Sequence, residues 1–78
     1  MNNIETADCF EEKVEYSGQN QGNPINNFQG TAAECQQLCA STSGCTFFVL
    51  RNNECAFKKT QGNKNSNPNA ISGPAKCT

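Results

Sequence analysis

The stretch TAAECQQLCA, residues 31–40, predicts a short helix with two cysteines on one face. Thr31 can cap the first backbone amides and Glu34 can reach back to it, which is the pattern of a capping box. Cys35, Leu38 and Cys39 stand at positions i, i+3 and i+4 and therefore share one face. Because a helix of this length is marginal alone in water, we expect its cysteines to anchor it by disulfides to the hairpin that follows.

The composition indicates one small secreted domain that depends on cross-links. The chain has 78 residues, of which six are cysteine. A domain of this size buries too little apolar surface to be stable without such links, and an even cysteine count at this density is typical of an oxidising compartment. No apolar run approaches the ~18 residues of a membrane span or forms a signal peptide. We therefore expect a secreted or extracellular module of a longer protein, without membrane insertion.

The charge gives no sign of a nucleic-acid partner. The chain carries six Lys and Arg against seven Asp and Glu. The acids gather in residues 1–34, with a net charge of −5, and the bases in residues 35–78, with a net charge of +4. Folding is expected to bring the two parts together and neutralise them, and no run of like charge is dense enough for a nucleic-acid surface.

Alternating apolar residues predict a half-buried strand from Phe10 to Tyr16, with Val14 on its apolar side. Glu11 and Glu15 fall on the polar side, and Glu12 alone interrupts the apolar side; the three carboxylates are expected to be solvated. Residues 17–27 predict a loop, since they contain two glycines and an Asn-Pro pair.

Two further strands are predicted at Cys45–Leu50 and Cys55–Lys58. The turn between them is expected at Asn52-Asn53, because asparagine tolerates left-handed backbone. That turn pairs Leu50 with Cys55, on the hairpin face expected to meet the helix. The opposite face is expected to be partly covered by a long loop.

The remaining segments are polar. Residues 60–69 contain no apolar side chain and predict a long mobile loop, followed by a last short strand at residues 70–72. Residues 1–8 predict a flexible N-terminal segment, which leaves residues 9–78 as a single module.

Six cysteines allow 15 pairings. A bridge from Cys39 to Cys45 closes a short turn at little entropic cost. Cys55 is then left for Cys35, with a loose fit that requires the strand to cross the helix at an angle. Cys9 and Cys77 remain, and their bridge would join the two ends.

The order of motifs resembles the PAN/apple family, found in tandem in plasma prekallikrein and coagulation factor XI. The Asn-rich loops and the Ala-Ile-Ser-Gly-Pro ending resemble most the apple modules of apicomplexan micronemal adhesive proteins. The resemblance covers residues 9–77. Its motifs are Cys9, Tyr16-Ser17-Gly18, Thr31-Ala32-Ala33-Glu34-Cys35, Cys39, Cys45 with Phe48, Cys55-Ala56-Phe57-Lys58, and Ser72-Gly73-Pro74 before Cys77.

The resemblance implies a small disulfide-rich α+β fold, in which a curved antiparallel sheet of about five strands packs on one helix at about residues 31–41. It also implies the same three pairs, Cys9–Cys77, Cys35–Cys55 and Cys39–Cys45, with the end-to-end bridge that apple members add to the PAN core.

The sequence argues against catalysis and cofactors. It contains no histidine, which removes Ser-His-Asp and Cys-His catalysis and the common zinc sites. The spacings of the four central cysteines fit no standard metal site, and no Cys-x-x-Cys indicates redox chemistry. We therefore expect neither an enzyme nor a bound cofactor or metal.

Four side chains are candidate ligand contacts: Tyr16, Arg51, Lys58 and Lys59. The alternative is that Tyr16 is a core residue with its hydroxyl at the rim and that the cations are solvating charges. The function expected from the resemblance is adhesion, with binding to protein or glycan on a host cell surface after storage in a secretory organelle such as the microneme. The alternatives are a spacer that contacts only neighbouring apple modules and, third, a small secreted inhibitor or toxin-like effector.

Overall fold

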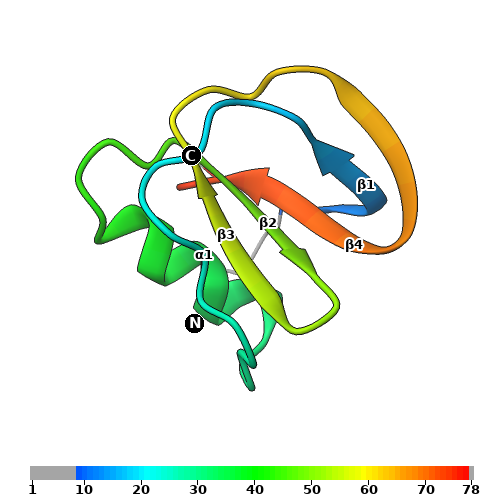
Figure 1. Cartoon of the computed structure of the whole chain (residues 1–78), viewed down its shortest axis with the longest axis horizontal. Helices are drawn as coiled ribbons and strands as arrows, with labels where there is room; N and C mark the ends of the chain where they lie inside the picture. The colour runs from blue at the N-terminus through cyan, green and yellow to red at the C-terminus, as the bar shows by residue number, and fades with distance from the viewer. Residues whose placement is uncertain (1–8, 78) are drawn as a thin grey trace, which may run out of the picture.

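A four-stranded antiparallel sheet, in the order β1-β4-β2-β3, carries helix α1 on one face (Figure 1). The computed structural model describes residues 9–77. The expected flexible segment 1–8 therefore lies outside the described residues. The elements are β1 at Glu11–Tyr16, α1 at Ala32–Ala40, β2 at Phe47–Arg51, β3 at Glu54–Lys58 and β4 at Lys64–Pro74.

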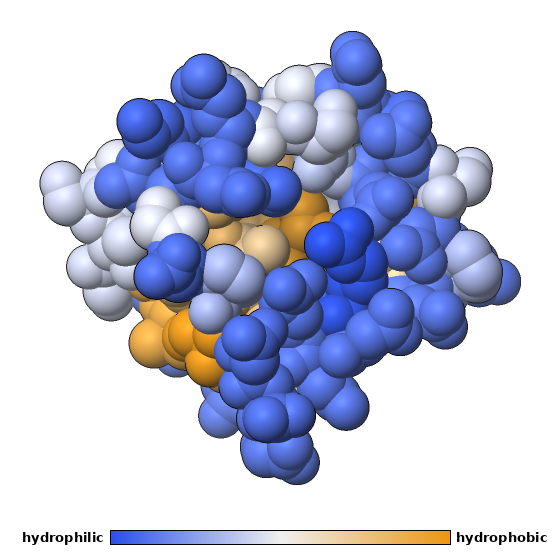
Figure 2. Space-filling model, in the orientation of Figure 1, coloured by the Kyte–Doolittle hydropathy of each residue, from blue (hydrophilic) through white to orange (hydrophobic). Residues whose placement is uncertain are grey.

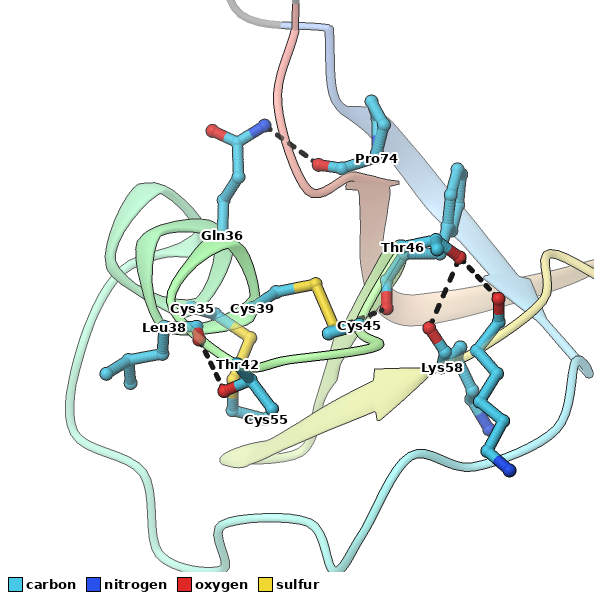
Figure 3. Close-up of a disulfide and its surroundings, with 12 residues drawn as sticks. Cys35, Gln36, Leu38, Cys39, Thr42, Cys45, Thr46, Cys55, Lys58 and Pro74 are labelled. Atoms are coloured by element: carbon cyan, nitrogen blue, oxygen red, sulfur yellow. Dashed lines mark hydrogen bonds between the residues drawn. A yellow bond between two sulfur atoms is a disulfide. The ribbon is translucent and has the colours of Figure 1, made fainter.

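Helix α1 begins as its sequence predicts. The Thr31 hydroxyl accepts a hydrogen bond from the Glu34 amide, and a Glu34 carboxylate oxygen accepts one from the Thr31 amide. Cys35 and Cys39 are fully buried, whereas Leu38 is 39% exposed. The predicted shared face is thus only partly buried, because at 3.6 residues per turn Leu38 lies about 100° around the helix from Cys39. Figure 3 shows its side chain pointing away from the disulfides.

The three disulfides are the pairs predicted from the sequence. Cys35–Cys55 joins α1 to β3, and Cys39–Cys45 joins the last helical turn to the segment before β2 (Figure 3). Cys9–Cys77 joins the two ends of the described chain, with 5.4 Å between the Cα atoms. The helix is thus fixed to the sheet at two points.

The side chain of Gln36 is a further link between α1 and the terminal disulfide. Its Nε2 donates to the carbonyl of Pro74 at 3.0 Å (Figure 3). The same Nε2 donates to the sulfur of Cys77 at 3.3 Å. The helix therefore contacts all three bridges.

The hairpin has the predicted register. Leu50 pairs with Cys55 and Phe48 with Phe57, while Asn52 and Asn53 both have positive φ, at 50° and 64°. Two left-handed central residues are the requirement of a type I′ turn, whose twist matches that of the strands.

The sheet buries apolar side chains on both faces. Against α1 lies a cluster of Cys35, Cys39, Cys45, Phe48, Cys55 and Phe57. On the opposite face, Tyr16 packs with Val49 and Ala56, flanked by Val14 and Phe47. The expected cover for that face was a long loop. The structure instead uses two side chains of β1, which reach over the hairpin from the far edge of the sheet.

The polar segment 60–69 is not the mobile loop that its composition predicts. From Lys64 onward it belongs to β4, where Lys64 pairs with Tyr16 and Ser66 with Val14. These side chains are exposed, and a strand on the solvated side of a sheet satisfies its backbone hydrogen bonds without apolar residues. The hydropathy of the sequence therefore did not indicate that this half of β4 is a strand.

Strand β1 also departs from simple alternation. Its register to β4 breaks between Glu12 and Val14, and Lys13 between them has a φ of 64°. This irregularity places Glu11 on the same side as Tyr16, whose hydroxyl donates to the Glu11 carboxylate.

The sheet has four strands and not the five expected from the resemblance. The segment 19–28 lies along the free edge of β3 and exchanges backbone hydrogen bonds with it, including a reciprocal pair between Ile25 and Cys55 at 2.9 Å. Gly22 and Pro24 interrupt the pairing. Proline has no backbone N–H to donate, and Gly22 has a left-handed backbone with a φ of 73°. The segment protects the edge without forming a strand.

Candidate functional site

Tyr16, the aromatic candidate, is a core residue. It is 6% exposed, and its ring meets that of Phe47 edge to face with 4.8 Å between the centroids. The bond from its hydroxyl to Glu11 and its burial raise the pKa of Tyr16. Tyr16 thus packs in the core, with its ring closed off from solvent.

Arg51 lies between two carboxylates at the hairpin end of β2. Its guanidinium bonds to Glu15 on β1 and, at 3.2 Å, to Glu54 on β3. These hydrogen bonds raise its pKa. Since the guanidinium is committed to both neighbours, its charge is compensated within the fold.

The two lysines lie at the other end of the hairpin. Lys58 donates to the side-chain oxygen of Asn20 at 2.7 Å. Lys59 is exposed, and its backbone amide donates to the carbonyl of Gln19. The structure therefore separates Arg51 from Lys58 and Lys59, and the four candidates do not converge on one site.

The carboxylates of β1 are not the uniform solvated face expected from alternation. Hydrogen bonds from Tyr16 and Lys64 lower the pKa of Glu11. Hydrogen bonds from Asn67 and Arg51 lower the pKa of Glu15. Both groups hold β1 to the rest of the sheet as charged acceptors, whereas Glu12 between them is exposed.

This arrangement predicts a loss of stability in acid. Because the pKa values of Glu11 and Glu15 are lower in the folded chain than the ordinary value of 4.5, their contribution is present above that value and disappears as the pH falls through the lowered values. We expect the melting temperature, followed by circular dichroism with the disulfides intact, to decrease below about pH 4.5. Glu15→Gln should make this decrease smaller.

Glu12→Gln is the matched control, since Glu12 is an exposed carboxylate on the same strand. Its acid transition should follow that of the wild type. An acid transition in Glu15→Gln as steep as in the wild type would contradict the role given to Glu15.

Two hollows lie on the helix side of the molecule, and no sequence pattern predicted them. The first measures about 450 Å³ and the second about 290 Å³. Phe28 and Gly30 line both hollows, and we call the two hollows together the amide groove. Its residues are Phe28, Gln29, Gly30, Glu34, Gln37, Leu38, Leu50, Asn52, Asn53, Asn69 and Ile71.

Gly30 lies in close contact with two side chains of this groove. A Cβ atom there would lie 2.6 Å from the ring of Phe28 and 2.6 Å from a carboxylate oxygen of Glu34, so a larger residue would displace these side chains. The groove has no sequence signature, because its asparagines and glutamines are equally typical of turns and exposed helix positions.

The described residues contain no cluster of three or more His, Cys, Asp or Glu side chains that could hold a metal ion. Among residues 9–77, no helix has the length and apolar character needed to cross a bilayer. No protein-family model matches the chain. No curated protein matches it either.

Three disulfides in a chain of this size indicate a secreted or extracellular protein. Together with the groove, this leaves an open surface with one charged side chain, Glu34, on a cross-linked frame as the strongest candidate for recognition.

Proposed function

We propose that this chain is a non-catalytic binding module of the PAN/apple type, part of a secreted multidomain protein that attaches to protein or carbohydrate on a host cell surface. The observation that carries the proposal is the disulfide frame. It fixes α1 to the hairpin at two points and joins Cys9 to Cys77. A surface held in this way loses little conformational entropy when a ligand binds.

The apple assignment is supported by the cysteine order and by the pattern of bridges. A helix bonded twice to the central hairpin, with a further bridge between the ends, is the arrangement that the resemblance implies. The segment along the edge of β3 occupies the place where a fifth strand would add to the sheet. Storage in a secretory organelle such as the microneme belongs to the same proposal.

The pKa values of two carboxylates support the proposal that the module is not an enzyme. Glu11 and Glu15 have lowered pKa values and accept hydrogen bonds from neighbouring side chains. A general acid or base that acts near neutral pH needs a pKa shifted toward that pH, and these two are shifted the other way.

The test is direct binding of the full chain to cells. Fluorescently labelled, oxidised protein should bind epithelial cells in a saturable manner and compete with its unlabelled form. The same chain, reduced and alkylated, is the control, and its binding should be lost. If neither the single chain nor a tandem repeat of it binds cells or immobilised glycans, the proposal fails.

A second candidate is a spacer or docking unit that contacts only neighbouring apple modules. It is favoured by the Cys9–Cys77 bridge, which makes the chain enter and leave the module at one point, with Cα atoms 5.4 Å apart. A parent protein that retained full cell binding after deletion of this module would support the spacer and contradict the adhesion module.

A further inference from the structure

We propose that the terminal disulfide Cys9–Cys77 is a thiol-exchange site. A small thiol, of which glutathione is the example, attacks the sulfur of Cys9, and Cys77 leaves as a thiolate. This inference does not depend on the adhesion function. It rests on the exposure of this bridge and on the N–H groups that point at one of its two sulfurs.

The terminal bridge is the most accessible of the three. Cys9 and Cys77 are each partly exposed to solvent. The other two bridges belong to the buried cluster against α1, where three of their four cysteines have no exposed surface. Exchange requires that a thiolate reach a sulfur atom of the disulfide. A thiol in solution therefore reacts with the terminal bridge while the other two are protected, and an otherwise hydrophilic surface such as that in Figure 2 admits a polar thiol.

Two N–H groups point at the sulfur of Cys77. The Cys9 amide donates to it at 3.0 Å, and Nε2 of Gln36 donates to it at 3.3 Å. The same Nε2 lies farther from the Cys9 sulfur, at 3.9 Å. Neutral sulfur is a weak acceptor, whereas a charged acceptor forms stronger hydrogen bonds. These donors therefore favour the thiolate at Cys77, which makes Cys77 the better leaving group and directs attack to Cys9.

The side chain of Gln36 is held in position before the reaction. Its backbone lies in α1 between the bridged Cys35 and Cys39. Its Nε2 also donates to the carbonyl of Pro74 at the end of β4, at 3.0 Å (Figure 3). Because the donor already points at the sulfur, it stabilises the charge that develops there without reorganisation.

The residues that precede the two cysteines have opposite charges. Asp8 precedes Cys9, and Lys76 precedes Cys77. A neighbouring cation favours a thiolate and a neighbouring anion disfavours it. The sequence thus adds to the preference that the hydrogen bonds create.

The exchange replaces one disulfide with another and needs no oxidant. The glutathione thiolate forms a bond to the Cys9 sulfur, the Cys9–Cys77 bond breaks, and its electron pair remains on Cys77, which then takes a proton from water. The product is glutathionylated Cys9, a reversible modification. Attack by Cys77 on the mixed disulfide restores the bridge and releases glutathione.

The reaction is local, because the sheet is held together directly inside the bridge. Glu11 of β1 pairs with Ser72 of β4, and the Ala75 amide donates to the Thr46 carbonyl at 2.9 Å. These bonds and the two buried bridges do not involve the terminal sulfurs. Exchange therefore separates the two ends and leaves the helix and the sheet in place.

The test is incubation of the oxidised full chain with reduced glutathione near neutral pH. Acid stops the exchange, pepsin digests the chain, and mass spectrometry locates the glutathione. The adduct on Cys9 should exceed that on Cys77 by about three- to tenfold, the effect of a hydrogen bond to the leaving sulfur. The four buried cysteines should remain bridged, and the circular dichroism spectrum should not change.

Gln36→Met removes the donor and keeps the length and helix propensity of the side chain. It should form the Cys9 adduct about three- to tenfold more slowly than the wild type. A purely structural role of Gln36 predicts the opposite, since loss of its bond to Pro74 would loosen the end and speed the exchange. Gln37→Met is the matched control, because Gln37 is exposed on the same helix, and it should react as the wild type does.

Three results would overturn the inference. The first is an adduct that forms on Cys77 as readily as on Cys9. The second is modification of the buried cysteines at the same rate, which would mean that the chain reacts only after it unfolds. The third is a rate for Gln36→Met equal to or above that of the wild type.

Discussion

Replacing Cys35 and Cys55 together by alanine should lower the melting temperature by roughly 12 to 24 °C, which brings unfolding close to body temperature. The bridge closes a loop with a sequence separation of 20, for which loss of the constraint costs about 3 kcal/mol, and each kcal/mol shifts the melting point of a domain this size by about 4–8 °C. Both residues are fully buried, so the lost packing adds to the effect. Thermal unfolding followed by circular dichroism measures it.

The double variant Cys39→Ala with Cys45→Ala is the comparison. It removes a bridge with a sequence separation of only 6, so it should cost about 1 kcal/mol less in chain entropy. α1 would still be held to β3. An unchanged melting point after loss of Cys35 and Cys55 would show that this bridge does not hold the helix to the sheet.

Gly18→Ala should destabilise the fold by about 3 kcal/mol or more, an effect of overpacking against backbone. A Cβ at this position would lie 1.7 Å from the carbonyl oxygen of Thr60. The segments there are joined by backbone bonds from Ser17 to Asn63 at 3.0 Å and from Gly18 to Gln61 at 3.1 Å. They must separate to admit the methyl group. Chemical denaturation of the oxidised variant measures the loss.

Gly22→Ala is the matched control in the same connection. Gly22 has a φ of 73° but no atom within 4 Å of its Cβ position, so alanine should cost only the left-handed backbone, about 1–2 kcal/mol. Equal losses at the two glycines would contradict the close packing of residues 17–19 against residues 60–63.

The features that sequence predicted correctly are those determined by near neighbours. The capping box of Thr31 and Glu34 fixes the start of α1, and the Asn52-Asn53 turn fixes the register of the hairpin. Once these two elements are in place, few cysteine pairings satisfy the geometry, and the three that form are those predicted.

What sequence did not predict depends on pairing between distant segments. The first half of β4 is a strand because β1 supplies its hydrogen bonds, and nothing in its own side chains indicates this. Arg51 looked available for a ligand because Glu15, 36 positions away, could not be placed beside it. The amide groove is assembled from the loop before α1, the helix, the hairpin and β4, so no local pattern could locate it.

The bridge between Cys9 and Cys77 has a mechanical consequence. When the chain is pulled from segments on either side of this bridge, the load passes through the covalent sulfur–sulfur bond and not through the sheet. The bridge spans a sequence separation of 68, which corresponds to roughly 230 Å of extended chain. This length cannot be extended while the bridge is intact. An attachment built from such units would keep its length and its folded surfaces under shear flow, and would lengthen only in a reducing environment.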